Sequence, residues 1–176
     1  MHEYAVDLAW TGAGPAGTSS YTSYGRDHEL TAGDKPPLPG TSDPAFRGDP
    51  GRWSPEELLV GSLSQCHMLW FLHLAATAGV VVVGYTDRAT GSMRVAAAGH
   101  GEFTSVTLRP LVTVRAPAVG TAEHVVALLD GLHRQAHEHC FIARSVNFPV
   151  TTQPAPPIIE PADGPVVHPA DRSAGT

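Results

Sequence analysis

The spacing of apolar residues changes several times along the chain, and each spacing predicts an element. Residues 4–10 alternate between apolar and polar side chains, which predicts a strand. A turn rich in Gly, Ser and Thr then leads into a returning strand that ends near residue 32. Runs of alternating or β-branched residues predict further strands at 81–87, 91–99, 102–116 and 145–150.

A long helix is predicted to begin after Ser54. Ser54 is a favourable N-cap, Pro55 suits the first helical position, and Glu57 completes a capping box with Ser54. Residues 57–78 contain no proline, and their apolar side chains are distributed around most of the helix. A helix that is apolar on nearly all sides is expected to be buried. Gly79 is expected to end it.

A second helix is predicted at residues 121–138, where apolar positions fall on one face. The Pro- and Gly-rich stretch 32–53 is expected to be a long structured loop. Residues 154–176 are rich in proline and small residues, so we expect an extended or mobile tail after a single domain at residues 1–153. The order of elements predicts an α+β domain in which a mostly antiparallel sheet packs on the helices.

Charge and composition exclude several functional classes. The chain has 176 residues, 11 basic against 17 acidic, and a net charge of −6. Without a basic cluster, nucleic acid is not an expected partner. The first ten residues do not resemble a signal peptide, and polar residues interrupt the apolar region 58–83. We therefore expect a cytoplasmic protein that does not cross a membrane.

Two cysteines, Cys66 and Cys140, are the first candidates for chemistry. In a reducing compartment they are either inert core residues or a redox pair. Cys66 lies in the predicted buried helix, where a thiol without a nearby cation stays protonated. His67 follows directly, but neighbouring helical residues point about 100° apart, so His67 need not touch the sulfur. The residues alone leave both interpretations open.

Histidines near the cysteines suggest a metal site as an alternative. His133 and His137 are four residues apart on one helix face, which is a spacing that suits metal ligands, and His139 is next to Cys140. The chain has no HExxH or CxxC motif, so we expect no metal and no cofactor. A zinc-dependent hydrolase remains an alternative function.

Several blocks together resemble the OsmC/Ohr family of organic hydroperoxide reductases, in a less characterised OsmC-like branch. The resemblance covers about residues 4–153, and its most specific block is PEELL, with Cys66 ten residues after the first glutamate. The other blocks are WTG, GTSSYTSYGRDHEL, the surroundings SDPAFRGDPGRWSPEELLVGSLSQCHMLWFLHLAATAG, and AHEHCFIARSVNFPV.

The resemblance implies an OsmC-like fold, an intertwined homodimer and active sites at the subunit interface. It implies that Cys66 attacks an organic hydroperoxide and that Cys140 resolves the sulfenic acid into a disulfide, which an external dithiol then reduces. It assigns an ion pair beside the sulfur to Arg26, in the GRD context, and Glu56. Phe141 stands where many relatives have proline. The alternative function is a non-catalytic relative that binds a small apolar ligand.

The position of Glu56 sets a geometric constraint on such a site. Ten residues of continuous helix separate Glu56 from Cys66, which corresponds to about 15 Å along the axis. Glu56 therefore cannot reach the sulfur directly. We expect its influence to pass through the arginine, through a break near the helix start, or across a subunit interface. Apolar residues next to Cys66 predict a preference for alkyl or lipid hydroperoxides over hydrogen peroxide: Met68, Leu69, Trp70 and Phe71.

Overall fold

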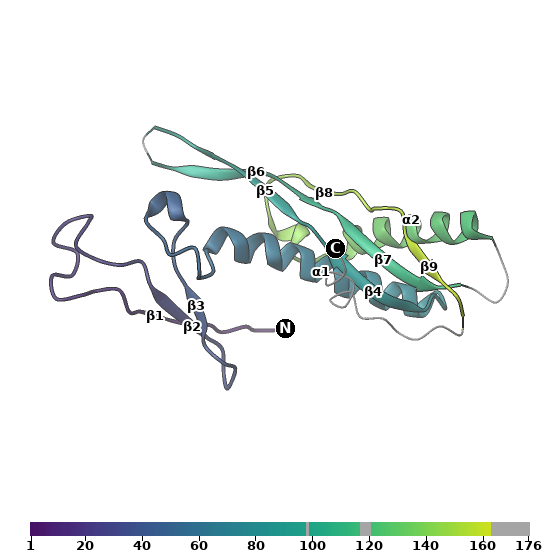
Figure 1. Cartoon of the computed structure of the whole chain (residues 1–176), viewed down its shortest axis with the longest axis horizontal. Coiled ribbons are helices and arrows are strands. Elements are labelled where there is room, and N and C mark those ends of the chain that lie inside the picture. The colour runs from purple at the N-terminus through teal and green to yellow at the C-terminus, as the bar shows by residue number, and fades with distance from the viewer. Residues whose placement is uncertain (98, 117–120, 163–176) are drawn as a thin grey trace, which may run out of the picture. The chain divides into compact units, whose positions relative to one another are not determined.

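The computed structural model describes residues 1–97, 99–116 and 121–162, and it forms two compact units that divide after Leu59 (Figure 1). The first unit holds a three-stranded antiparallel sheet in the order β1-β2-β3. Its elements are β1 (Asp7–Trp10), β2 (His28–Thr31), β3 (Leu38–Gly40) and the short 3₁₀ helix η1 (Pro44–Phe46).

Strand β3 lies inside the stretch that the sequence predicts to be a loop. Its sequence is Leu-Pro-Gly, and Pro39 is opposite Glu29 of β2 at the edge of the sheet. An edge strand tolerates proline because it has a neighbouring strand on one side only, so the N–H that proline lacks is not needed for hydrogen bonds on the other side. Pro and Gly have low strand propensity, which explains why no strand was predicted here.

Helix α1 (Pro55–Thr77) begins and ends as predicted. The Ser54 N–H donates to Glu57 Oε2 at 2.9 Å, and the Glu57 N–H donates to Ser54 Oγ at 3.2 Å, which completes the capping box. Gly79 adopts a left-handed φ of 72° after the last turn. The Val80 N–H bonds the Ala75 carbonyl, so the helix ends in a Schellman motif.

Burial of α1 differs from the prediction, because the chain covers only one stripe of the helix. Leu63, His67, Phe71 and Ala75, spaced four residues apart, are its buried residues, whereas Leu69 is 61% exposed. Among the described residues, α1 is also the one helix that is long and apolar enough by composition to cross a membrane. The core helix of a soluble protein shares these properties, so composition does not decide between them.

The second unit, from Val60 onward, holds two three-stranded sheets, most of α1 and the whole of α2 (Ala122–His139) (Figure 1). One sheet has the order β4-β7-β9 and the other β5-β6-β8. Each combines an antiparallel with a parallel pair. The strands are β4 (Val82–Asp87), β5 (Thr90–Val95), β6 (Gly101–Leu108), β7 (Pro110–Arg115), β8 (Val150–Thr152) and β9 (Ile158–Glu160).

The single strand predicted at 102–116 is two strands, β6 and β7, in different sheets. The break falls at Arg109, immediately before Pro110, which has no N–H for a ladder. The Arg109 N–H instead donates to Asp87 Oδ1 at 2.6 Å. The short strand predicted at 145–150 overlaps β8 only at Val150.

Part of the predicted tail is structured. Strand β9 pairs with β7 in parallel, and Arg115 Nη1 lies 3.6 Å from Glu160 Oε2 in a largely buried ion pair. Residues 163–176 lie outside the described residues. The ordered chain therefore continues at least nine residues beyond the predicted domain boundary at 153.

Two clusters of buried side chains form the core of the second unit. The larger joins α1, α2 and β7, with the predicted apolar face of α2 buried: Val125, Leu129, Leu132 and Ala136. The smaller contains Leu63 of α1 and Val106 and Leu108 of β6. The predicted α+β class is confirmed, and both helices pack against β7 in the larger cluster.

Candidate functional site

The structure brings the two cysteines together, although 73 residues separate them in the sequence. Cys66 lies in the middle of α1, and Cys140 is the C-cap of α2. Both are free thiols, and they lie close enough for Cys66 to raise the pKa of the Cys140 thiol. A cysteine pair in contact can form a disulfide with little movement of the backbone.

The environment of Cys140 keeps its thiol protonated. Burial raises the pKa of Cys140 to about 11, and the hydrogen bond and charge of Cys66 act in the same direction. The Ala143 N–H donates to Cys140 Sγ at 3.4 Å and partly opposes this shift. Cys140 is 1% exposed, whereas Cys66 is only partly buried. Cys66 is therefore the sulfur that a reagent in solution reaches first.

An exposed patch of apolar and aromatic side chains adjoins both cysteines. Leu69 and Trp70 follow Cys66 by three and four residues on α1, so they share its face. The Trp70 ring lies 5.5 Å from the Phe141 ring and 5.0 Å from the His139 ring. Phe141 is 66% exposed. This aromatic patch consists of Leu69, Trp70, His73, His139 and Phe141, and it includes a cavity of about 250 Å³ at the first three.

Phe71 does not belong to the apolar surroundings of Cys66 that the sequence suggested. It is fully buried and stacks on His133 at a centroid distance of 4.2 Å. The 100° step between helical residues explains the difference, because Phe71 falls on the buried stripe of α1.

Two buried histidines connect α1 to α2. His67 Nε2 and His133 Nδ1 are 3.1 Å apart and share a hydrogen bond between nearly parallel rings. His67 therefore points into the core. Burial and then His137 lower the pKa of His67 to about 4, although Asp87 opposes them. Burial and then His67 lower the pKa of His133 to about 4.

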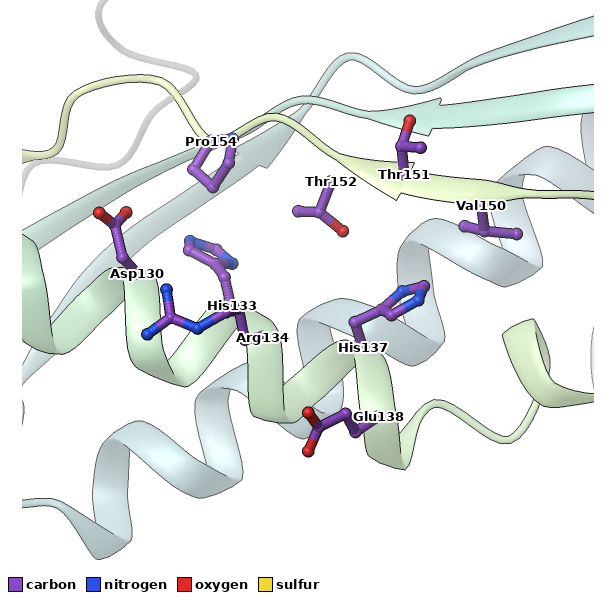
Figure 2. A pocket seen from close by; sticks show the side chains of 9 residues that line it. All are labelled: Asp130, His133, Arg134, His137, Glu138, Val150, Thr151, Thr152 and Pro154. Carbon is purple, nitrogen blue, oxygen red and sulfur yellow. The ribbon is translucent and has the colours of Figure 1, made fainter.

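Metal binding by these histidines finds no support in the described part of the chain. There, no group of three or more His, Cys, Asp or Glu side chains could hold a metal ion. Figure 2 shows His133 and His137 one turn apart on α2, but His133 uses one ring nitrogen to bind His67.

Asp87, at the end of β4, is a residue that the sequence did not suggest. Its carboxylate accepts from Ser64 Oγ at 2.6 Å and from the Arg109 N–H at 2.6 Å. It therefore fixes α1, two residues before Cys66, to the junction between β6 and β7. No sequence motif marks it, because its two partners come from segments more than 20 residues away on either side.

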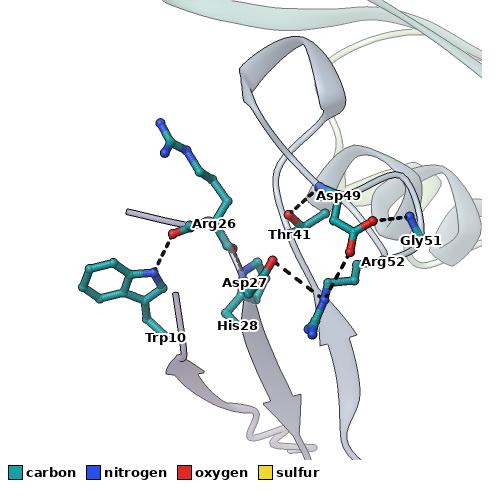
Figure 3. Close-up of polar contacts among 9 residues, drawn as sticks. Trp10, Arg26, Asp27, His28, Thr41, Asp49, Gly51 and Arg52 are labelled. Atoms are coloured by element: carbon teal, nitrogen blue, oxygen red, sulfur yellow. Dashed lines mark hydrogen bonds and ion pairs between the residues drawn. The ribbon is translucent and has the colours of Figure 1, made fainter. Parts of the chain in front are cut away.

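Arg26 lies in the first unit, where two tyrosines hold its side chain. Its guanidinium carbon is 4.4 Å from the Tyr21 ring centroid and 4.2 Å from that of Tyr24. The guanidinium also donates to the carbonyls of Tyr24 at 2.6 Å and Tyr21 at 3.1 Å. In Figure 3 it points away from the ion pairs of Arg52 with Asp27 and Asp49. Arg26 has no carboxylate partner among the described residues.

Gly12 and Gly25, which belong to the WTG and YGRD blocks, position the segment before Arg26. The Gly25 N–H donates to the Gly12 carbonyl at 2.7 Å. The side chain of Trp10, which is drawn in Figure 3, donates from Nε1 to the Gly25 carbonyl at 3.0 Å. A Cβ on Gly12 would collide with the Gly25 carbonyl. The WTG and YGRD blocks therefore specify one close approach of two backbones, which fixes the base of the Arg26 side chain.

Glu56 lies in the first turn of α1 and is partly buried. Its Oε2 is shielded from solvent and has no hydrogen-bond partner among the described residues. Within Met1–Leu59, Arg26 and Glu56 do not form an ion pair with each other. The pairing of these two residues beside Cys66 stays a prediction.

Comparison with known proteins decides the family. The model of the OsmC-like protein family matches residues 48–154, which include both cysteines and Glu56. The chain belongs to the OsmC-like family. An OsmC-like protein of unknown function from Vibrio cholerae is 30% identical, with a TM-score of 0.76, and the match covers 88% of this chain and 100% of that one.

More distant OsmC-like structures share the fold. Organic hydroperoxide resistance proteins from Legionella pneumophila and Elizabethkingia anophelis are each 14% identical, with a TM-score of 0.58. Each match covers 91% of this chain and 98% of the other. None of the curated proteins matches the chain.

The lowered pKa values of His67 and His133 predict that acid destabilises the fold. Both stay neutral in the folded state down to about pH 4, whereas in the unfolded chain they take up protons below about pH 6.5. The unfolded state therefore binds more protons in this window, and stability falls as the pH drops. Between pH 7 and pH 5 we expect a loss of about 2 kcal/mol for each histidine, measured by urea denaturation.

His133→Asn should remove about half of this pH dependence, whereas His124→Asn, at an exposed position on the same helix, should leave it unchanged. A free energy of unfolding that stays constant between pH 7 and pH 5 would contradict the buried, neutral pair.

Proposed function

We propose that this OsmC-like protein is a thiol peroxidase that reduces organic hydroperoxides to alcohols. The observation that supports this most strongly is the contact between Cys66 and Cys140 beside an exposed aromatic patch. The organic hydroperoxide resistance proteins that share the fold agree with it. No cofactor is required, because the two thiols supply both electrons.

In the first step, the Cys66 thiolate attacks the terminal oxygen of the hydroperoxide, which is the one that carries the hydrogen. That bond breaks, the alkoxide takes a proton and leaves as the alcohol, and the sulfur becomes a sulfenic acid. Only the thiolate is nucleophilic. The high pKa of Cys140 keeps a hydrogen on that sulfur, so Cys140 can donate it in a hydrogen bond to a thiolate on Cys66.

In the second step, Cys140 condenses with the sulfenic acid. The S–S bond forms, the sulfenic hydroxyl leaves with the Cys140 proton as water, and an external dithiol later reduces the disulfide by exchange. Because the two thiols already lie close enough to interact, this step needs little rearrangement. The burial of Cys140 protects it from direct oxidation.

The aromatic patch favours alkyl or lipid hydroperoxides over hydrogen peroxide. Leu69, Trp70 and Phe141 offer apolar contacts to an organic group, and hydrogen peroxide has no such group. Phe141 is itself part of this surface.

We further propose that the active protein is a homodimer in the cytoplasm and that Arg26 and Glu56 complete the site across its interface. A guanidinium near Cys66 would favour the thiolate. Three features agree with this: the uncovered apolar face of α1, the lack of a carboxylate partner for Arg26, and the shielded, unpartnered Glu56 Oε2. Exposed Leu8 and Trp10 on β1 add a second apolar surface that a partner subunit could cover.

Single cysteine variants test the chemistry. With cumene hydroperoxide and dithiothreitol, Cys66→Ser should abolish turnover, since no sulfur remains that can be oxidised and reached. Without dithiothreitol, which would itself reduce a sulfenic acid, Cys140→Ser should react once with the peroxide and accumulate a Cys66 sulfenic acid, which dimedone traps and mass spectrometry detects. Undiminished turnover in Cys66→Ser would refute the mechanism, and absence of peroxide consumption by the wild type would favour the non-catalytic binding alternative.

A mixing experiment tests the shared site. Cys66→Ser and Arg26→Gln proteins are inactive or weakly active alone, and their subunits are exchanged in equal amounts. If Arg26 acts across the interface, half of the dimers hold one intact site, and activity should rise to about a quarter of wild type. As the matched control, Arg47→Gln takes the place of Arg26→Gln in the same mixture with Cys66→Ser. If mixing restores nothing, Arg26 does not act across subunits.

A further inference from the structure

A second cavity lies between α2 and β8, on residues that the peroxidase proposal does not use. It measures about 500 Å³, which is within the range of small-molecule sites. It is lined by Asp130, His133, Arg134, His137 and Glu138 of α2, by Val150, Thr151 and Thr152 of β8, and by Pro154. In Figure 2 the rings of His133 and His137 point from α2 toward Thr152, whereas Glu138 points away from β8.

Unpartnered buried nitrogens indicate which ring atoms carry hydrogen. His67 Nδ1 and His137 Nδ1 are both buried and have no partner among the described residues. An unpartnered buried N–H is rarer than an unpartnered lone pair, so we assign both as bare nitrogens. His67 then carries its hydrogen on Nε2 and donates it to His133 Nδ1.

The same assignment puts two donors at the cavity. Because His133 Nδ1 accepts, the neutral His133 ring carries its hydrogen on Nε2. Because His137 Nδ1 is bare, the neutral His137 ring also carries its hydrogen on Nε2. The buried side-chain atoms without a hydrogen-bond partner do not include Nε2 of His133 or Nε2 of His137. Because both histidines line the cavity, both Nε2 atoms can contact a molecule that binds there. Neither offers a lone pair to a metal ion.

Arg134 adds positive charge next to these donors. It is exposed, lines the cavity and forms no ion pair with a described residue. Asp130 lines the same cavity and Glu138 points away, so the charge that opposes an anion is concentrated at the Asp130 end. Val150 and Pro154 supply apolar wall on the opposite side. Donors and a guanidinium on one side with apolar wall on the other suit an amphipathic anion.

We infer that this cavity is a second binding site, which takes a small carboxylate with an apolar body. The carboxylate accepts hydrogen bonds from His133 Nε2, His137 Nε2 and the Arg134 guanidinium. The apolar body rests on Val150 and Pro154. This inference does not depend on the peroxidase proposal, because it uses none of the residues assigned to the reaction.

Calorimetry with hexanoate as the probe tests the site, with hexylamine and methyl hexanoate as matched compounds. Hexanoate should bind with saturation at one site per chain, hexylamine should not bind, and the ester should bind more weakly because it lacks the charge. Arg134→Gln should weaken hexanoate binding about tenfold, since it removes a charge-assisted hydrogen bond. Arg144→Gln, an exposed arginine outside the cavity, is the matched control and should bind like wild type.

A second measurement does not depend on affinity. ¹⁵N NMR of the histidine rings should show His133 and His137 protonated on Nε2, and both rings should shift when hexanoate is added. Lack of saturable hexanoate binding, equal binding of hexylamine, or unchanged affinity in Arg134→Gln would overturn the inference. So would a His133 ring protonated on Nδ1.

Discussion

The hydrogen bond between two buried imidazoles, His67 and His133, is the contact on which the rest of the candidate site depends. It joins the middle of α1 to the middle of α2, and Phe71 stacks on the same His133 ring. Cys66 directly precedes His67, and Cys140 follows His133 by two helical turns. Loss of one imidazole would leave its partner buried without a hydrogen bond, which costs about 1–3 kcal/mol. The pair thus fixes the register in which the two thiols meet.

Within this register, burial gives the two cysteines different properties. Cys140 is closed off at the end of α2, and its pKa rises, whereas Cys66 remains accessible on a face of α1 that the chain does not cover. The same uncovered face carries the aromatic patch. Asp87 secures α1 near Cys66 from the opposite side by accepting from Ser64 and from the backbone at Arg109. An asymmetric pair of this kind suits one attacking and one resolving sulfur.

Local signals in the sequence predicted the helices well. Ser54, Glu57 and Gly79 act within one or two turns of their own positions, so the capping box and the helix end followed directly from the residue types. The strand at 102–116 was wrong in one respect, because the change of sheet at Pro110 depends on which distant strands pair on either side. Strands β3 and β9 likewise form through pairing with β2 and β7, and their own sequences have weak strand propensity or lie in a proline-rich stretch.

The candidate site, like the fold, has parts that could be predicted from the sequence and parts that could not. The sequence blocks that resemble the OsmC/Ohr family pointed to Cys66 and Cys140, and the fold brings these two residues together. The roles of Arg26 and Glu56 stay predictions, because the residues within reach of each do not include the other. Asp87, the His67–His133 bond and the cavity beside Thr152 could not be predicted, since each joins segments that lie 12 or more residues apart.

The most direct test of the central claim is to map the thiols after one equivalent of an organic hydroperoxide reacts with the reduced protein. Thiol titration should show the loss of two thiols per chain. Peptide mass spectrometry should find one disulfide, between Cys66 and Cys140 of the same chain. If both thiols persist, or if Cys66 accumulates as sulfinic acid while Cys140 stays reduced, the two cysteines do not work as a pair and the account fails.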